Sequence, residues 1–356
     1  MHPDRWENGS DYPWIGLPSA ASAGEADPVP WASGGLLLSS GRDALRLVLS
    51  TGMRRRGWRR LWVPQYFCQV VTAALVTPGL ELRAYADSPL RSTPQLPDAS
   101  LGDAMLVVNY FGLRNAVHVT PPLGVDVIED HSHDPTSTWA ASSSADFCVA
   151  SLRKTVPIPD GGVVWSPVGH GLPRPPRITE QRRRAAASKL AGMLLKAMYL
   201  DNHDVEKATY RDLLAGGEEA LHVPAISGIS DVSRSLVQAF SFRAWRDARR
   251  RNHALLAERL AGIKWLRVLM PDSDDAVPFS AVVLTESAER RELVRQWLIA
   301  NRVYPAVLWP LEETVLDVSD DARSLSRRLL SIHCDGRYDA PGIERVAGLV
   351  CRTPGR

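Results

Sequence analysis

Two stretches decide the fold of this chain: VIEDHSHDP at residues 127–135 and SLRKTVPIPDGGVV at residues 151–164. In each, a short apolar run with β-branched residues ends in polar side chains, which include Glu129 and Asp130 in the first stretch and Lys154 in the second. Short apolar runs bounded by turn residues are typical of buried strands. Ligands bind at the carboxyl ends of strands in open α/β sheets. The two stretches therefore predict successive strands that bring an acid and a lysine to a ligand site.

Outward from these stretches, short apolar runs alternate with helical patterns. Strands are expected at residues 36–40, 61–64, 80–85, 104–110, 125–129, 147–151 and 162–165. Helices are expected at residues 42–50 and 68–75. Such alternation predicts a mainly parallel sheet covered on both faces.

The pattern changes after residue 166. Charged helices are expected at 182–200 and 204–214, followed by one long amphipathic helix at 236–260 that links two domains. A smaller α/β unit is expected from strands and helices at 279–284, 287–300, 304–308 and 343–351. The predicted fold class is α/β, with a mostly parallel sheet in a large domain (35–235) and a small C-terminal α/β domain that includes the linking helix (236–356). Residues 1–34, rich in Pro, Gly, Ser and Trp, are predicted to form an N-terminal arm that packs on a partner subunit.

Composition narrows the function classes. The 356 residues are 45% hydrophobic and 23% charged, with a formal net charge of +2, so nothing favours binding to nucleic acid or to an anionic membrane. No apolar run of about 18 residues predicts a transmembrane helix, and residues 1–18 do not look like a secretory signal. Four cysteines without a CxxC pair argue against zinc ribbons and are consistent with a cytoplasmic protein. The arginine runs at 54–56, 182–184 and 249–251 are predicted to be solvated helix faces.

The stretch SSGRDAL at residues 39–45 places a glycine between a strand and a helix. Backbone N–H groups and the helix dipole make such a turn an anion site, and Gly41 would let a phosphate approach the backbone closely. The alternative is a plain turn capped by Ser40 or Asp43.

The polar residues after the two deciding strands also allow several interpretations. Asp130 could bind a metal with its neighbouring histidines, cap a helix, or keep a cofactor's ring nitrogen protonated. Lys154 could extend to the surface, or it could form a Schiff base if burial or a nearby cation such as Arg153 lowers its pKa. Ser151 and Arg153 could bind a phosphate beside it.

In this order, the glycine turn, the acid and the lysine resemble the fold-type-I pyridoxal-phosphate (PLP) enzymes, and most closely the DegT/DnrJ/EryC1/StrS group of sugar aminotransferases. The resemblance covers roughly residues 36–350. Its motifs are SGRDAL (40–45), VPQYFCQVVTAAL (63–75), VNYFGL (108–113), VIEDHSH (127–133), SLRK…DGGVV (151–164) and LLSIHCDGRYDAPGIERVAGLV (329–350).

The resemblance implies a role for each matched residue. Lys154 would form the Schiff base and act as the catalytic residue, and Asp130 would meet the pyridine nitrogen. Ser132 would lie against the ring and His133 would reach the ring hydroxyl. The remaining cofactor-binding residues that it implies are Gly41, Arg42 and Ser151 at the phosphate, and Phe67 and Cys68, with Tyr66 beside them, at the ring.

This sequence departs from the group's pattern at several positions. Ser132 replaces the usual alanine, Ser151 precedes the lysine by three residues and not five, and Cys68 stands where a ring-stacking aromatic is usual. The Gly-Tyr-Asn motif that reaches a neighbouring subunit's phosphate is absent from this sequence, and Ser230 or Ser233 is a candidate substitute.

The function implied is amino-group transfer from a small-molecule donor to a keto group of a sugar nucleotide or related biosynthetic intermediate, by a homodimer that holds PLP through Lys154 and binds no metal. Tyr304, Trp309 and His333 are candidate acceptor-lining residues, although Tyr304 and Trp309 could equally be small-domain core. Three alternatives stay open. They are a PLP enzyme with another reaction such as elimination or dehydration, a catalytically idle regulator, and a metal hydrolase that uses His131, His133 and Asp134.

Overall fold

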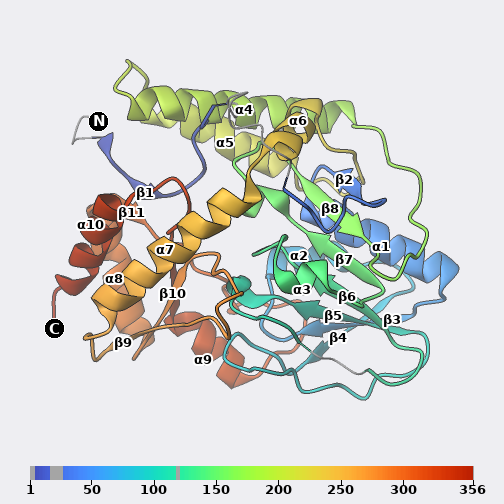
Figure 1. Cartoon of the computed structure of the whole chain (residues 1–356). Helices are drawn as coiled ribbons and strands as arrows, with labels where there is room; N and C mark the ends of the chain where they lie inside the picture. Colours follow the sequence, from blue (N-terminus) through green and yellow to red (C-terminus); the bar gives the residue numbers. More distant parts are fainter. Residues whose placement is uncertain (1–4, 17–26, 118–120, 356) are drawn as a thin grey trace.

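The computed structural model describes residues 5–16, 27–117 and 121–355. Its main sheet has seven strands in the order β2-β8-β7-β6-β5-β3-β4 (Figure 1). The five parallel strands are β3 (Arg60–Pro64), β4 (Glu81–Tyr85), β5 (Asp103–Val108), β6 (Asp126–Asp130) and β7 (Phe147–Ala150). Only β8 (Gly162–Trp165) runs antiparallel to its neighbours, which are β7 and β2 (Leu36–Leu38). The predicted, mostly parallel sheet is confirmed.

The strands of this sheet form where the sequence is apolar, and β5, β7 and β8 are buried along their whole length. A strand buried on both faces needs helices on each side. The helices and helical turns between the strands are α1 (Gly41–Arg55), α2 (Gln69–Leu75), η3 (Tyr110–Gly112), α3 (Thr138–Ala141) and η4 (Leu152–Lys154). Two longer helices follow β8, α4 (Glu180–Leu200) and α5 (Lys207–Ala220), and they lie side by side at one end of the molecule (Figure 1).

A second, antiparallel sheet lies in the C-terminal part, in the order β12-β10-β9. Its strands are β9 (Leu266–Val268), β10 (Ala281–Thr285) and β12 (Leu329–Ile332). Around them lie α7 (Phe242–Leu260), α8 (Ala288–Ala300), α9 (Asp320–Arg328) and α10 (Ala340–Cys351). Leu256, Val283, Ile332 and Val346 belong to one buried apolar cluster, so this part has its own core. The boundaries at 34/35 and 235/236 stay predictions.

The prediction of one long helix at 236–260 is wrong. The structure has α6 (Asp231–Ala239) and α7, separated at Phe240 and Ser241, whose backbones are extended. The Phe240 ring packs against Phe242 and Trp245 at centroid distances of 5.1 and 5.4 Å. Neither residue is a helix breaker, so tertiary packing overrides the local propensity. The strand predicted at 304–308 is also shorter, because β11 covers only Val303–Tyr304.

The described part of the N-terminal arm packs on its own chain. Strand β1 (Asn8–Gly9) pairs in parallel with β11, and the Trp14 N–H donates to the carbonyl of Met193 in α4 at 2.8 Å. Residues 5–16 therefore connect the C-terminal part to the α4–α5 pair. Residues 1–4 and 17–26 of the predicted arm lie outside the described residues.

Two of the arginine runs are not wholly solvated, contrary to the prediction. Arg54, Arg55 and Arg56 are exposed, but Arg182 and Arg249 are only 1% and 2% exposed. Arg182 pairs with Asp43 at 3.0 Å, and Arg249 donates to the carbonyl of His133 at 3.2 Å. One member of each of these two runs therefore points inward and finds acceptors. In the described part of the chain, no helix combines the length and the apolar character needed to cross a membrane.

Candidate functional site

A cavity of about 380 Å³ lies where β6 and β7 end. The two strands are parallel neighbours with Asp130 opposite Val149, so Asp130 lies close to Ser151 and η4, which follow β7. All nine residues predicted for the cofactor line this cavity, namely Gly41, Arg42, Phe67, Cys68, Asp130, Ser132, His133, Ser151 and Lys154. The volume is within the range of roughly 300–1,000 Å³ that is common for small-molecule sites. The structure thus brings the predicted residues together, and their roles toward a cofactor stay predictions.

The turn before α1 is held against the turn after β7. Ser40 caps α1, since its Oγ accepts a hydrogen bond from the Asp43 N–H at 3.2 Å. A Cβ on Gly41 would lie 2.8 Å from the Cβ of Ser151, and a Cβ on Gly162 would lie 2.2 Å from the backbone carbon of Ser40. Only glycine fits at these two positions. Ser40 therefore caps the turn, as one interpretation of the SSGRDAL stretch predicted. The same turn also places the N-terminus of α1 at the cavity, as the phosphate-site interpretation requires.

A chain of hydrogen bonds fixes the acid end of the cavity. The Ser132 N–H donates to Oδ1 of Asp130 at 2.8 Å, and the Ser151 N–H donates to Oγ of Ser132 at 2.9 Å. The second carboxylate oxygen of Asp130 has no hydrogen-bond partner among the described residues, and it is not enclosed in the protein interior. Asp130 is therefore positioned through one oxygen and can bind a ligand through the other.

Lys154 is half-buried and does not extend into solvent. Its Nζ lies 3.3 Å from Nε2 of His133, whose Nδ1 accepts a hydrogen bond from the Phe111 N–H at 3.1 Å. Burial, and then the charges of Lys154 and Arg249, hold the pKa of His133 well below its usual value. His133 is therefore neutral at neutral pH, and its Nδ1 also lies 3.3 Å from the carbonyl oxygen of Asn109. Nε2 of a neutral imidazole thus lies within hydrogen-bond reach of the lysine amine at the cavity wall.

Aromatic rings form the wall beside Lys154. The Trp309 ring stacks on His133 at a centroid distance of 5.6 Å and an interplanar angle of 26°. Nζ of Lys154 lies 5.5 Å from the centroid of the Trp309 ring, and Phe279 contacts the other side of His133 at 5.0 Å. Trp309 is 6% exposed, so it is core and cavity wall at once.

The other aromatic candidates fall into two groups. Phe67 lines the cavity together with Cys68, whereas Tyr66 is fully buried and donates its hydroxyl proton to the carbonyl of Leu308. His333 lines the cavity, but Tyr304 does not, and its hydroxyl accepts a hydrogen bond from Lys207 at 3.1 Å.

A charged cluster at the α1 side of the cavity was missed from the sequence. Glu218 on α5 binds both Nη atoms of Arg153, accepts a hydrogen bond from Nζ of Lys189 at 2.6 Å, and lies 3.7 Å from Nη2 of Arg42. Burial alone would raise the pKa of Glu218, but Arg153 and Lys189 hold it far below its usual range, so the carboxylate is charged.

The α4–α5 pair brings Lys189 and Glu218 together by close packing. A Cβ on Gly217 would lie 2.4 Å from Cγ of Lys189, and a Cβ on Gly192 would lie 2.7 Å from Cγ of Leu214. A glycine inside a helix costs about 1 kcal/mol relative to alanine, so two of them mark a close contact. These glycines were the signal in the sequence that could have predicted the pair.

The proposed substitutes Ser230 and Ser233 have other partners. Both hydroxyls donate to Oδ1 of Asp160, at 2.5 and 2.6 Å, within the same chain. Each hydroxyl has one proton to donate, so neither is available to a phosphate of a neighbouring subunit. These contacts do not favour the hypothesis, which stays a prediction.

The metal-hydrolase alternative also lacks a shared site. His131 binds Glu129 at 2.9 Å, His133 faces Lys154, and Asp134 pairs with Arg246 at 3.0 Å. Glu129, His131 and Cys148 do lie within 4.8 Å of one another, but Glu129 also accepts hydrogen bonds from Trp139 and Ser143. The Glu129 carboxylate in this buried group is therefore already engaged by hydrogen bonds within the chain.

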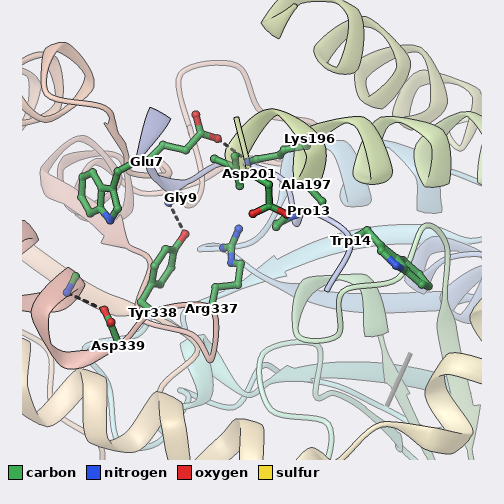
Figure 2. Close-up of a pocket in the computed structure, with 13 residues that line it drawn as sticks. Glu7, Gly9, Pro13, Trp14, Lys196, Ala197, Asp201, Arg337, Tyr338 and Asp339 are labelled. Atoms are coloured by element: carbon green, nitrogen blue, oxygen red, sulfur yellow. Dashed lines mark hydrogen bonds and ion pairs between the residues drawn. The ribbon is translucent and has the colours of Figure 1, made fainter. Parts of the chain in front are cut away.

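A second cavity, of about 310 Å³, lies beneath the N-terminal segment and is lined by α4 and the start of α10 (Figure 2). Lys196 pairs with Glu7 at 2.8 Å there, and the Gly9 N–H donates to the hydroxyl of Tyr338 at 2.7 Å. None of the nine predicted residues lines it, so the cavity at Lys154 is the candidate active site.

Comparison with known proteins supports the same fold. No protein-family model and no curated protein matches the sequence. Solved structures do match: the putative sugar aminotransferase Spr1654 from Streptococcus pneumoniae in its PLP form is 12% identical with a TM-score of 0.62, covering 98% of this chain and 100% of that one. The aminotransferase TlmJ from Streptoalloteichus hindustanus is 16% identical with a TM-score of 0.61, covering 96% and 97%.

A third match carries a sugar nucleotide. DesI, solved in the presence of its TDP-sugar product, is 18% identical with a TM-score of 0.59, covering 90% of this chain and 81% of that one. At these identities the matches show the fold. The chain has the fold-type-I architecture of PLP-dependent aminotransferases, and the predicted resemblance to the DegT/DnrJ/EryC1/StrS group is confirmed at that level.

Proposed function

We propose that this protein is a PLP-dependent aminotransferase. It would transfer an amino group from a small-molecule donor to a keto group of a sugar nucleotide or a related biosynthetic intermediate. The observation that carries the proposal is the amine of Lys154 in one cavity with the carboxylate of Asp130 and the N-terminus of α1. The names of the matched structures, among them sugar aminotransferases, support the substrate class.

The residues present fit the cofactor. Asp130 has an oxygen left for a protonated ring nitrogen, and Phe67, Cys68, Ser132 and His133 line the space for the ring. Gly41, Arg42 and Ser151 lie where α1 begins, as a phosphate requires. Bound PLP would supply an electron sink next to the amine-bearing carbon of a substrate.

The chain's own groups would then handle the proton. Lys154 would bind the cofactor in the resting enzyme and, once displaced, move a proton at Nζ as general base and acid. His133, whose Nε2 lies 3.3 Å from Nζ, would help to hold the amine in position for this role. Asp130, anchored by the Ser132 N–H, would keep the ring nitrogen protonated.

We also infer the larger organisation. Residues 35–235 would form the cofactor-binding domain, and residues 236–356 would place Trp309 and His333 over the cavity. Two copies would pair as a symmetric homodimer, which is the commonest form of a soluble oligomer.

Replacement of Lys154 tests the proposal. The Lys154→Ala protein should lose the visible absorbance band of covalently bound PLP and about 10³-fold or more of the turnover. Lys264→Ala, which removes an exposed lysine, should change neither. A Lys154→Ala protein that keeps both the band and the turnover would disprove the assignment.

A labelled amino donor separates transamination from the other PLP reactions. Transfer of the label to an acceptor is expected. If a keto product forms while no acceptor gains the label, the protein instead catalyses a different reaction on the same fold.

A further inference from the structure

The cluster around Glu218 has more positive than negative charge. Three cations, Arg42, Arg153 and Lys189, meet one carboxylate, and His222 lies 3.7 Å from the same carboxylate. Burial and the neighbouring cations lower the pKa of His222, which favours its neutral form. The side chains of the three cations are 9%, 18% and 7% exposed, so solvent compensates them poorly. Buried charges need partners, and these three cations exceed the one carboxylate that pairs with them by two charges.

Other acids near the cluster do not close this gap. Asp160 acts on Arg153 through space, but it accepts hydrogen bonds from Ser230 and Ser233, and no ion pair joins it to Arg153 among the described residues. Asp11 also acts on Arg153 and Lys189 through space, and no ion pair joins it to either among the described residues.

The cations also have unused hydrogen-bond donors. Arg42 makes one hydrogen bond, of 3.4 Å, to the carbonyl of Leu221, and Lys189 makes one, to Glu218. Nε of Arg153 is buried and has no acceptor among the described residues. Five N–H donors on an arginine normally find several acceptors when buried. Arg42, Arg153 and Glu218 line the cavity itself, so a ligand there can reach the cluster.

We propose that Glu218 is a built-in counter-ion of a phosphate site. It holds Arg153 and Lys189 in place when no phosphate is bound, and its like charge limits how tightly a phosphate monoester binds. The α4–α5 pair thereby sets the cofactor affinity from within the same chain. This inference rests on the proposed function, since the phosphate is that of PLP.

The side-chain exposure of Glu218 supports this role. Its side chain is 37% exposed and faces the cavity, whereas the cations that it binds are nearly enclosed. A dianion that enters from the cavity would therefore meet Glu218 and Arg42 together. Repulsion between two charged groups a few ångströms apart is strong where water is scarce.

Binding of PLP and of pyridoxal, which lacks the phosphate, tests the inference without any activity assay. In Glu218→Gln, the Kd for PLP should fall on the order of tenfold, because a like charge is removed, and the Kd for pyridoxal should not change. Glu219→Gln removes the same charge from an exposed position on α5 and should match the wild type for both ligands. The Kd values come from absorbance titration or equilibrium dialysis.

Lys189→Met removes a positive charge from the same cluster, and it tests the inference independently if Glu218→Gln does not fold. Its Kd for PLP should rise several-fold, and its Kd for pyridoxal should stay constant. If PLP binds no more tightly to folded Glu218→Gln, or if pyridoxal gains as much as PLP, the inference is wrong. If Glu218→Gln does not fold, an unchanged Kd for PLP in Lys189→Met overturns the inference. A wild type that binds neither ligand would instead refute the proposed function.

Discussion

The two cavities, at Lys154 and beneath the N-terminal segment, are similar in size but differ in how their buried cations are matched. In the second cavity, Nζ of Lys196 has three partners, which are Glu7 at 2.8 Å, the hydroxyl of Ser10 at 3.1 Å and the carbonyl of Asp11 at 2.7 Å. Arg337 is equally satisfied, since it binds both oxygens of Asp335 and the carbonyls of Ser10 and Asp11.

The cations at the first cavity are left with free donors. Arg42 has a single long hydrogen bond, and Arg153 and Lys189 share the one carboxylate of Glu218. A closed network rigidifies a protein, whereas an open one gains free energy from a ligand of opposite charge. The difference is what we expect if the second cavity fastens the N-terminal segment and if, as we propose, the first binds an anion.

The largest expected effect is a loss of stability when the closed network at the second cavity loses a carboxylate. Glu7→Gln leaves Lys196 buried beside a neutral amide, and it removes the carboxylate that pairs with Lys207 at 2.7 Å. Loss of one partner of a buried ion pair costs about 3–5 kcal/mol of unfolding free energy. Urea unfolding should show this loss, and the Kd for PLP should not change.

Glu313→Gln is the matched control, because Glu313 is exposed. It should leave both the urea midpoint and the Kd at wild-type values. If Glu7→Gln weakened PLP binding by itself without loss of stability, the second cavity would belong to the binding site and the contrast would fail.

The next effect concerns His333, which lines the first cavity and lies beside Arg337 of the closed network. Burial, and then Arg337, lower the pKa of His333 to about 4. In the unfolded chain the pKa of this histidine is about 6.5, so the unfolded state binds the proton more readily than the folded state. The contribution of His333 to the unfolding free energy is therefore fully present above about pH 6.5, and it is lost as the pH falls from about 6.5 to 4.

Between pH 7 and pH 5 this histidine should cost the wild type about 2 kcal/mol of unfolding free energy. His333→Gln has no such proton and should lose correspondingly less over the same interval. Urea unfolding at both pH values measures the difference. Equal losses in the two proteins would mean that His333 titrates normally in the folded state.

The gathering of the nine predicted residues in one cavity could be predicted in large part, because the key residues follow local rules. Asp130 is the last residue of β6, Lys154 lies in the helical turn η4 that follows β7, and Gly41 begins α1. Parallel strands place their carboxyl ends together, so the order of elements alone assembles these residues. The same reasoning predicted the mostly parallel sheet.

The contacts that were missed depend on tertiary packing. Glu218 reaches the cavity and binds Lys189 because α4 and α5 pack closely, and no periodic pattern connects either residue to residue 153. Phe240 interrupts a helix through its ring contacts, and Arg182 turns inward because Asp43 is there. Such outcomes depend on partners far away in the sequence.

A smaller effect is expected when the open network loses one cation. Arg42→Met removes a donor that has only one weak hydrogen bond, and burial already lowers the pKa of this arginine. Stability should change little, since the loss of charge relieves part of the desolvation cost. The Kd for PLP should rise about tenfold, as for one charge-assisted hydrogen bond, and the Kd for pyridoxal should remain the same. A large loss of stability with an unchanged Kd would show that Arg42 has a structural role, like the cations of the closed network.

The smallest effect on stability and on PLP binding is expected at a surface arginine that belongs to neither the closed nor the open network. Arg184 lies two residues after buried Arg182, is 79% exposed, and pairs with Glu180 at 3.0 Å on the surface of α4. Water screens such a pair, so its contribution is small. Arg184→Ala should leave the urea midpoint and the Kd for PLP unchanged within error. Arg182→Met should lower the urea midpoint clearly, because Asp43 would stay buried without its partner. Equal behaviour of the two variants would show that burial and partner number do not determine what an arginine contributes in this protein.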